Sequence, residues 1–133
     1  MSGRRREHRN HLSEMIERRY RPPGTSLSRA EVKAASVRGD RDALRRIAEE
    51  RGGLEGEHDV RFGLDLPGPA LAGEVATTLR DEGYAVTVER SDGRALVVAA
   101  IRFEPTEDAL RAHTERFCAL ADAYAARYRG FAL

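Results

Sequence analysis

The second half of the chain alternates apolar and polar residues over short runs. In "DVRFGLDL", residues 59–66, every second residue is apolar, which predicts a half-buried β-strand. Two further β-rich runs flank Ser91-Asp92-Gly93, and Asp-Gly between such runs predicts a hairpin. The second of these runs, "ALVVAAI" at 95–101, is apolar on both faces, so we expect it to be a central strand.

Two other segments of this half repeat their apolar residues with the period of an α-helix. The first follows "PGP" and is expected to end at Gly83. The second is expected to begin after Thr106, a residue type that caps helix N-termini. Its apolar stripe consists of Leu110, Phe117, Leu120, Ala121, Tyr124 and Tyr128.

The first half of the chain predicts three short helices with thin apolar faces. An amphipathic helix over 12–20 is followed by "RPPGTS", which cannot continue it. Ser28 and Glu31 have the spacing of a capping box, so a second helix is expected from Arg29 to Gly39. Asp40 is expected to cap a third helix that ends before Gly52.

The order of elements from residue 58 onward is strand, helix, strand, strand, helix, and a short "RGFAL" that can form a last strand. This β-α-β-β-α-β order predicts an α+β protein with a ferredoxin-like sandwich, in which two helices cover one face of a four-stranded antiparallel sheet. The last strand is expected at an edge beside the first. Residues 1–57 then form an Arg-rich helical extension that leans on the ferredoxin-like domain at 58–133.

Such a sheet leaves one face without helices, and Leu96, Val98 and Ala100 are predicted to lie on it. Contiguous aliphatic surface usually marks a contact with another segment or chain. The amino-terminal helices are the first candidate to cover this face. A second copy of the chain, stacked sheet on sheet, is the second candidate, and a different protein is the third.

Charge and composition narrow the class of protein. The net charge is +1, with Arg concentrated near the start, so the balance gives no reason to expect an anionic partner. Cys118 is the single cysteine, which fits a reducing cytoplasm. The opening "MSGRRREHRN" lacks the apolar core of a signal peptide, and no run approaches the length that spans a bilayer. We therefore expect a cytoplasmic protein that does not enter membranes.

Motifs for catalysis or cofactors are absent from the sequence. It contains no phosphate-binding loop, nucleophile elbow or paired-cysteine metal signature. His8 and His11 lack a third metal ligand. His113 and Cys118 are separated by about 500° of helical turn, so they do not stack as a nucleophile and its base. We expect a protein that is not an enzyme and carries no cofactor.

RNA is the main alternative ligand. The Arg-rich start at 3–9 can contact phosphates. The sheet, however, lacks the exposed aromatic residues that stack RNA bases, because Phe62 and Tyr84 fall in phase with the core. A ferredoxin-like domain that binds RNA or a small ligand is therefore the second hypothesis for function.

Residues 58–133 resemble the domain of the regulator of ribonuclease activity B (RraB) family. The matching features are a His-led first strand, a helix that ends in Gly-Tyr, a hairpin, a helix with Leu-Ala near its end, and a closing tetrapeptide. They correspond to His58, Gly83 with Tyr84, Leu120 with Ala121, and Tyr128, Arg129, Gly130 and Phe131. The closing motif has Arg129 where the family has Asp, and Phe131 where it has Trp.

This resemblance implies a ferredoxin-like fold and a non-catalytic function, namely binding and regulating a ribonuclease of the ribonuclease E type. Our first hypothesis is therefore a protein-interaction module. The candidate interaction or motif positions are Tyr84, Leu96, Val98, Tyr128, Arg129, Gly130 and Phe131. In the tail, Tyr128 is expected to extend the helical stripe, and Gly130 to lead the chain out of the helix toward an edge strand.

Overall fold

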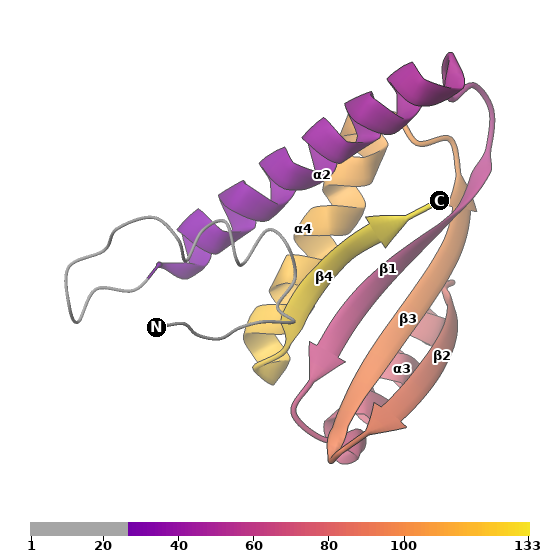
Figure 1. Ribbon diagram of the computed structural model, residues 1–133. Coiled ribbons are helices and arrows are strands. Elements are labelled where there is room, and N and C mark those ends of the chain that lie inside the picture. Colours follow the sequence, from indigo (N-terminus) through magenta and orange to yellow (C-terminus); the bar gives the residue numbers. More distant parts are fainter. Residues whose placement is uncertain (1–26) are drawn as a thin grey trace.

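The computed structural model describes residues 27–133, which form three helices and one four-stranded sheet (Figure 1). In chain order the elements are α2 (Arg29–Arg51), β1 (His58–Leu66), α3 (Pro69–Asp81), β2 (Ala85–Ser91), β3 (Arg94–Phe103), α4 (Glu107–Tyr124) and β4 (Arg127–Ala132). The predicted helix at 12–20 and the Arg-rich start lie outside the described residues. None of the helices between 27 and 133 is long and apolar enough to cross a membrane.

The strands follow the order β2-β3-β1-β4, and every neighbouring pair is antiparallel. The predicted succession of elements is confirmed, and so is the edge position of the last strand beside the first. Asp92 and Gly93 both adopt positive φ and make the tight turn between β2 and β3. The protein is therefore α+β, and its arrangement is compatible with a ferredoxin-like sandwich.

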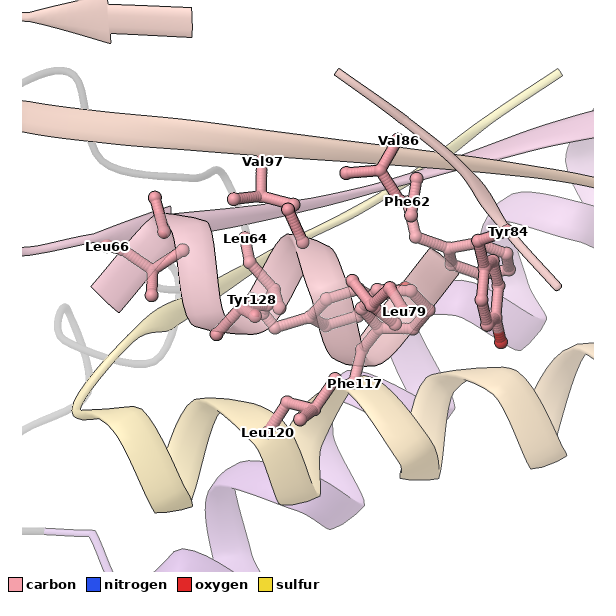
Figure 2. Close-up of a cluster of buried hydrophobic side chains, with 14 of the residues drawn as sticks. Phe62, Leu64, Leu66, Leu79, Tyr84, Val86, Val97, Phe117, Leu120 and Tyr128 are labelled. Atoms are coloured by element: carbon pink, nitrogen blue, oxygen red, sulfur yellow. The ribbon is translucent and has the colours of Figure 1, made fainter. Parts of the chain in front are cut away.

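Helices α3 and α4 lie on the same face of the sheet and enclose the core with it (Figures 1 and 2). The alternation in β1 puts its apolar side chains toward these helices, as predicted. The largest fully buried side chains include Val60, Phe62, Leu64, Leu66, Val75, Leu79, Val97, Leu110 and Phe117. Burying each of them stabilises the fold by about 2 kcal/mol, so this layer is its main source of stability.

Helix α2 is continuous from Arg29 to Arg51, so the prediction of a break at Gly39 and a cap at Asp40 was wrong. Its start is confirmed, because Ser28 and Glu31 form the predicted capping box. The break does not occur because Asp40 is buried within the helix and accepts hydrogen bonds from α4 and β4. These contacts outweigh the disadvantage of about 1 kcal/mol for a glycine inside a helix.

Helix α2 packs on α4 and contacts the edge strand β4 (Figure 1). Leu44 joins the core, and the exposed Arg45 forms an ion pair with Glu107 in the first turn of α4, with Nε 2.7 Å from Oε2. The expectation that this amino-terminal helix covers the open face of the sheet is therefore wrong for α2. It packs on α4 instead because its buried side carries Ala35, Ser36, Asp40 and Leu44, and the hydrogen-bond partners of Asp40 lie on α4 and β4.

The end of α4 differs from the prediction by one turn. The helix stops at Tyr124, and Ala125 adopts a left-handed conformation with φ of 53°. Tyr128 is therefore not part of the helical stripe but lies on β4 opposite Leu64. Gly130 does not lead out of the helix, because it lies within β4. Pairing with β1 buries Tyr128 and also satisfies the backbone of the tail.

Candidate protein-interaction surface

The face of the sheet opposite α3 and α4 is not covered by any described element (Figure 1). Leu96, Val98 and Ala100 run along its centre on β3, and each is half-buried. Directly paired residues of neighbouring strands point to the same face. The cross-strand partners on this open face are Asp65, Gly63 and Arg61 on β1, and Glu89, Thr87 and Ala85 on β2.

The centre of the open face is an apolar strip whose side chains are partly covered by their neighbours, and it is not a fully exposed apolar patch. Val32 of α2 is the one large hydrophobic side chain that is exposed in the described part of the chain. Leu96 and Val98 are less exposed than Val32, and only part of their surface is in contact with water. Such a strip can be buried by a partner without making the free protein prone to aggregate.

Charged side chains surround this strip and are weakly paired. Asp65 lies 3.3 Å from the Nε of Arg94 and 3.9 Å from a nitrogen of Arg129. Arg102 pairs with Asp59 in the same way. Arg61 has no acidic side chain within ion-pair distance among residues 27–133. Exposed pairs contribute about 0–1 kcal/mol, so these arginines can change partners when another molecule docks.

A bulge at the edge of the sheet brings Arg129 onto the open face. The register between β1 and β4 shifts beside Gly63, and Gly130 adopts a φ of +94°, which favours glycine. A Cβ at Gly63 would lie 3.3 Å from the Cβ of Arg129 and 3.8 Å from Leu96. The glycine thus lets the stem of Arg129 cross β1 beside the apolar strip.

The structure places the seven candidate positions on both faces of the sheet. Leu96, Val98 and Arg129 share the open face. Tyr84 and Tyr128 are buried in the core, and Phe131 packs against it. The positions therefore do not form one site, and three of them remain available to a partner.

A buried polar cluster, which the sequence reasoning missed, joins α2, α4 and β4. The hydroxyl of Tyr128 donates to Asp40 Oδ2 at 2.5 Å, and the hydroxyl of Thr114 donates to the same oxygen at 2.7 Å. Burial raises the pKa of Asp40, and the two hydrogen bonds partly offset this effect. Burial and the neighbouring carboxyl group raise the pKa of Tyr128, which therefore stays a donor. The sequence did contain a signal for the burial of Asp40, because this residue lies four positions from both Ser36 and Leu44 and so shares the buried side of the helix with them.

A second pair, Tyr84 and His113, lies at the aromatic end of the core. The Tyr84 oxygen is 2.6 Å from His113 Nδ1, and the imidazole also contacts Phe62 and Phe103, with ring centroids 5.4 and 4.5 Å away. Burial raises the pKa of Tyr84 to about 12, so the phenol is the donor to a neutral imidazole. Burial also lowers the pKa of His113.

Protonation of His113 should therefore weaken the fold at mildly acidic pH. A folded-state pKa below the ordinary value of 6.5 gives stability that is present above pH 6.5 and is lost as the pH falls through the folded-state pKa. We expect the free energy of unfolding of the natural chain to fall between pH 7 and pH 5 more steeply than that of His113→Gln. Denaturant unfolding across this range measures both slopes, and parallel slopes would contradict the assignment.

His113 and Cys118 have different surroundings in the structure. Cys118 is buried near Ser36 and Asp40, and burial raises the pKa of its thiol. His113, five residues earlier on the same helix, contacts Tyr84 instead. Within residues 27–133, no group of three or more His, Cys, Asp or Glu side chains could hold a metal ion. His8 and His11 lie outside the described residues.

Comparison with known proteins does not assign the chain to a family. No protein-family model matches it, and neither does any curated protein. The resemblance of residues 58–133 to the RraB family therefore stays a prediction from their motifs.

Proposed function

We propose that the protein is a non-catalytic regulatory module that binds a protein partner through the open face of its sheet. The observation that carries this proposal is the half-buried strip of Leu96, Val98 and Ala100, which no described element covers. Helix α2, the first candidate to cover it, packs on α4 instead. A partner that buries the strip would remove apolar surface from water at about 25 cal/mol per Å².

The charges around the strip define the chemistry of the partner segment. Four arginines and three acidic residues lie on the open face: Arg61, Arg94, Arg102, Arg129, Asp59, Asp65 and Glu89. Since Arg61 has no ion pair within the described residues, it favours a carboxylate on the partner. The proposed segment therefore presents apolar side chains to Val98 and its neighbours and an acidic side chain to Arg61.

A ribonuclease is the proposed partner. The motifs shared with the RraB family support it, because that resemblance implies binding and regulation of a ribonuclease in RNA degradation. The ferredoxin-like assignment of the sandwich is part of the same proposal, and it is supported by the βαββαβ order with the last strand beside the first. A cytoplasmic location goes with this function.

The test is a direct binding and inhibition assay with a purified ribonuclease of the ribonuclease E type. We expect the full chain to bind the enzyme and slow cleavage of a labelled RNA. Val98→Glu places a charge in the strip and should abolish both effects, because the partner would have to bury the carboxylate. Ala119→Glu, at an exposed position of α4 on the other side of the molecule, is the matched control and should behave like the natural chain.

Three outcomes would contradict parts of this proposal. If the natural chain neither binds nor slows the nuclease, the nuclease is the wrong partner. If Val98→Glu acts like the natural chain, the open face is the wrong surface. A gel shift of RNA by the chain alone, weakening as salt rises, would instead support the alternative of an RNA-binding domain.

A further inference from the structure

The two edges of the sheet differ in how well they are protected against pairing with a further strand. At β4 the edge is bent by the bulge at Gly130 and lies beside α2. At β2 the register with β3 runs without a shift from Ala85 to Ser91, and no described strand pairs with its outer side. The β2 edge is thus a regular row of backbone groups that can accept another strand.

The tight turn defines which residues of β2 face outward. A two-residue hairpin loop makes Ser91 and Arg94 a hydrogen-bonded pair, and such pairs alternate along an antiparallel ladder. The N–H and C=O groups of Val86, Val88 and Arg90 therefore point away from β3. A side-chain contact agrees with this assignment, because Arg80 of α3 donates to the Val86 carbonyl at 3.1 Å.

Arginines lie at both ends of this outward-facing row. Arg80 reaches the edge at Val86, and Arg90 follows Val86 and Val88 on the side of the sheet that α3 covers. Both side chains are exposed, and neither forms an ion pair within residues 27–133. A carbonyl is a weaker partner for a guanidinium than a carboxylate is. Arg80 thus covers the edge until an acidic group offers it a better partner.

We propose that the outer edge of β2 binds an extended acidic segment of a protein partner, which adds to the sheet as an antiparallel strand. Its backbone pairs with Val86, Val88 and Arg90, and it carries carboxylates opposite Val86 and Arg90 with an apolar residue between them. The recognised pattern is acidic-x-apolar-x-acidic, because residues two apart in a strand share a face. Arg80 releases the Val86 carbonyl and pairs with the carboxylate opposite Val86.

The same charges disfavour a second copy of the chain on this edge. In an antiparallel pair of β2 strands centred on Val88, Arg90 of one copy would lie opposite Val86 of the other, where Arg80 already sits. Centring the pair on Glu89 would oppose two like charges directly. Pairing farther toward the start of β2 would use Tyr84, whose N–H already donates to Leu79.

The test is an NMR titration of the isotope-labelled full chain with two synthetic peptides. Binding is monitored through the backbone amide signals of the chain. The probe is Thr-Glu-Thr-Val-Thr-Glu-Thr, and the control peptide has Lys in place of both Glu residues. We expect the probe to shift the amides of Val86, Val88 and Arg90 and to bind at least about tenfold more tightly than the control. Added salt should reduce this ratio.

Two variants at one exposed position separate the contribution of the backbone to probe binding from that of the side chain. Arg90→Ala removes the guanidinium and keeps the outward N–H, whereas Arg90→Pro removes both and leaves the ladder with β3 intact. We expect Arg90→Pro to bind the probe several-fold more weakly than Arg90→Ala, by about the contribution of one hydrogen bond. Circular dichroism and the melting temperature verify that both variants are folded.

Equal binding of the two peptides, or of the two variants, would overturn the proposal. So would edge shifts that appear on concentrating the chain without peptide, since these would assign the edge to a second copy. The proposal is independent of the open face, because Val98→Glu should still bind the probe. Failure of one surface is therefore distinguishable from failure of the other.

Discussion

Phe117→Ala is expected to lower the free energy of unfolding by about 4 kcal/mol. Phe117 is fully buried on α4, and its ring centroid lies 4.9 Å from that of Phe62, 5.4 Å from Tyr84 and 6.1 Å from Tyr128. It thus joins β1, β4 and Tyr84, which directly precedes β2, in one aromatic cluster (Figure 2). Truncation leaves a cavity that these large rings cannot refill. Equilibrium unfolding in urea, monitored by circular dichroism, measures the change.

Phe103→Ala is the matched control, since it deletes the same atoms at the rim of the same cluster. Phe103 is half-buried, and its ring centroid lies 6.4 Å from that of Phe62. Because water can fill the vacated space, a loss of about 1 kcal/mol is expected. Equal losses for the two variants would show that Phe117 is not the centre of the core.

Asp40→Ala is expected to cost about 3 kcal/mol, which is unusual for an aspartate in a helix. The variant removes the carboxylate that accepts from the hydroxyls of Tyr128 and Thr114 at a largely buried site. Thr114 keeps only its longer contact with the Leu110 carbonyl, at 3.0 Å. It also releases the one buried polar contact that joins α2 to both α4 and β4 among residues 27–133. Thermal or urea unfolding of the full chain gives the size of the loss.

Two controls distinguish the stability contributed by the hydrogen bonds of Asp40 from the effects of helix propensity and of charge. Asp42→Ala makes the same change at an exposed position of the same helix and should stay within about 0.5 kcal/mol of the natural chain. Asp40→Asn keeps an oxygen acceptor and should cost about 1 kcal/mol. If Asp40→Ala is as mild as Asp42→Ala, the cluster adds nothing to stability.

Local patterns predicted most of the elements because their causes are local. Alternation in 59–66 places four apolar residues on one side whatever the rest of the chain does. The capping box at Ser28 and the turn at Asp92 and Gly93 each close within a few residues. These signals also placed Leu96 and Val98 on the uncovered face.

The errors occurred where distant residues decide the structure. The local sequence predicts Asp40 to be a helix cap. In the structure its hydrogen bonds come from Thr114 and Tyr128, which are 74 and 88 residues later in the chain. Tyr128 continues the helical period of α4, but pairing with β1 places it in a strand. The contact of Arg80 with the β2 edge was likewise not predictable, because an exposed arginine carries no sequence signal for a carbonyl six residues away.

The long-range Asp40 network also suggests an order of folding. The acceptor on α2 can be satisfied only after α4 has formed and β4 has paired with β1, since the two donors lie on these elements. Bringing such distant segments together delays folding more than it reduces stability. We therefore expect α2 to dock last during folding and to be the first element to detach when the native protein opens locally, so that its amides exchange hydrogen before those of the sheet.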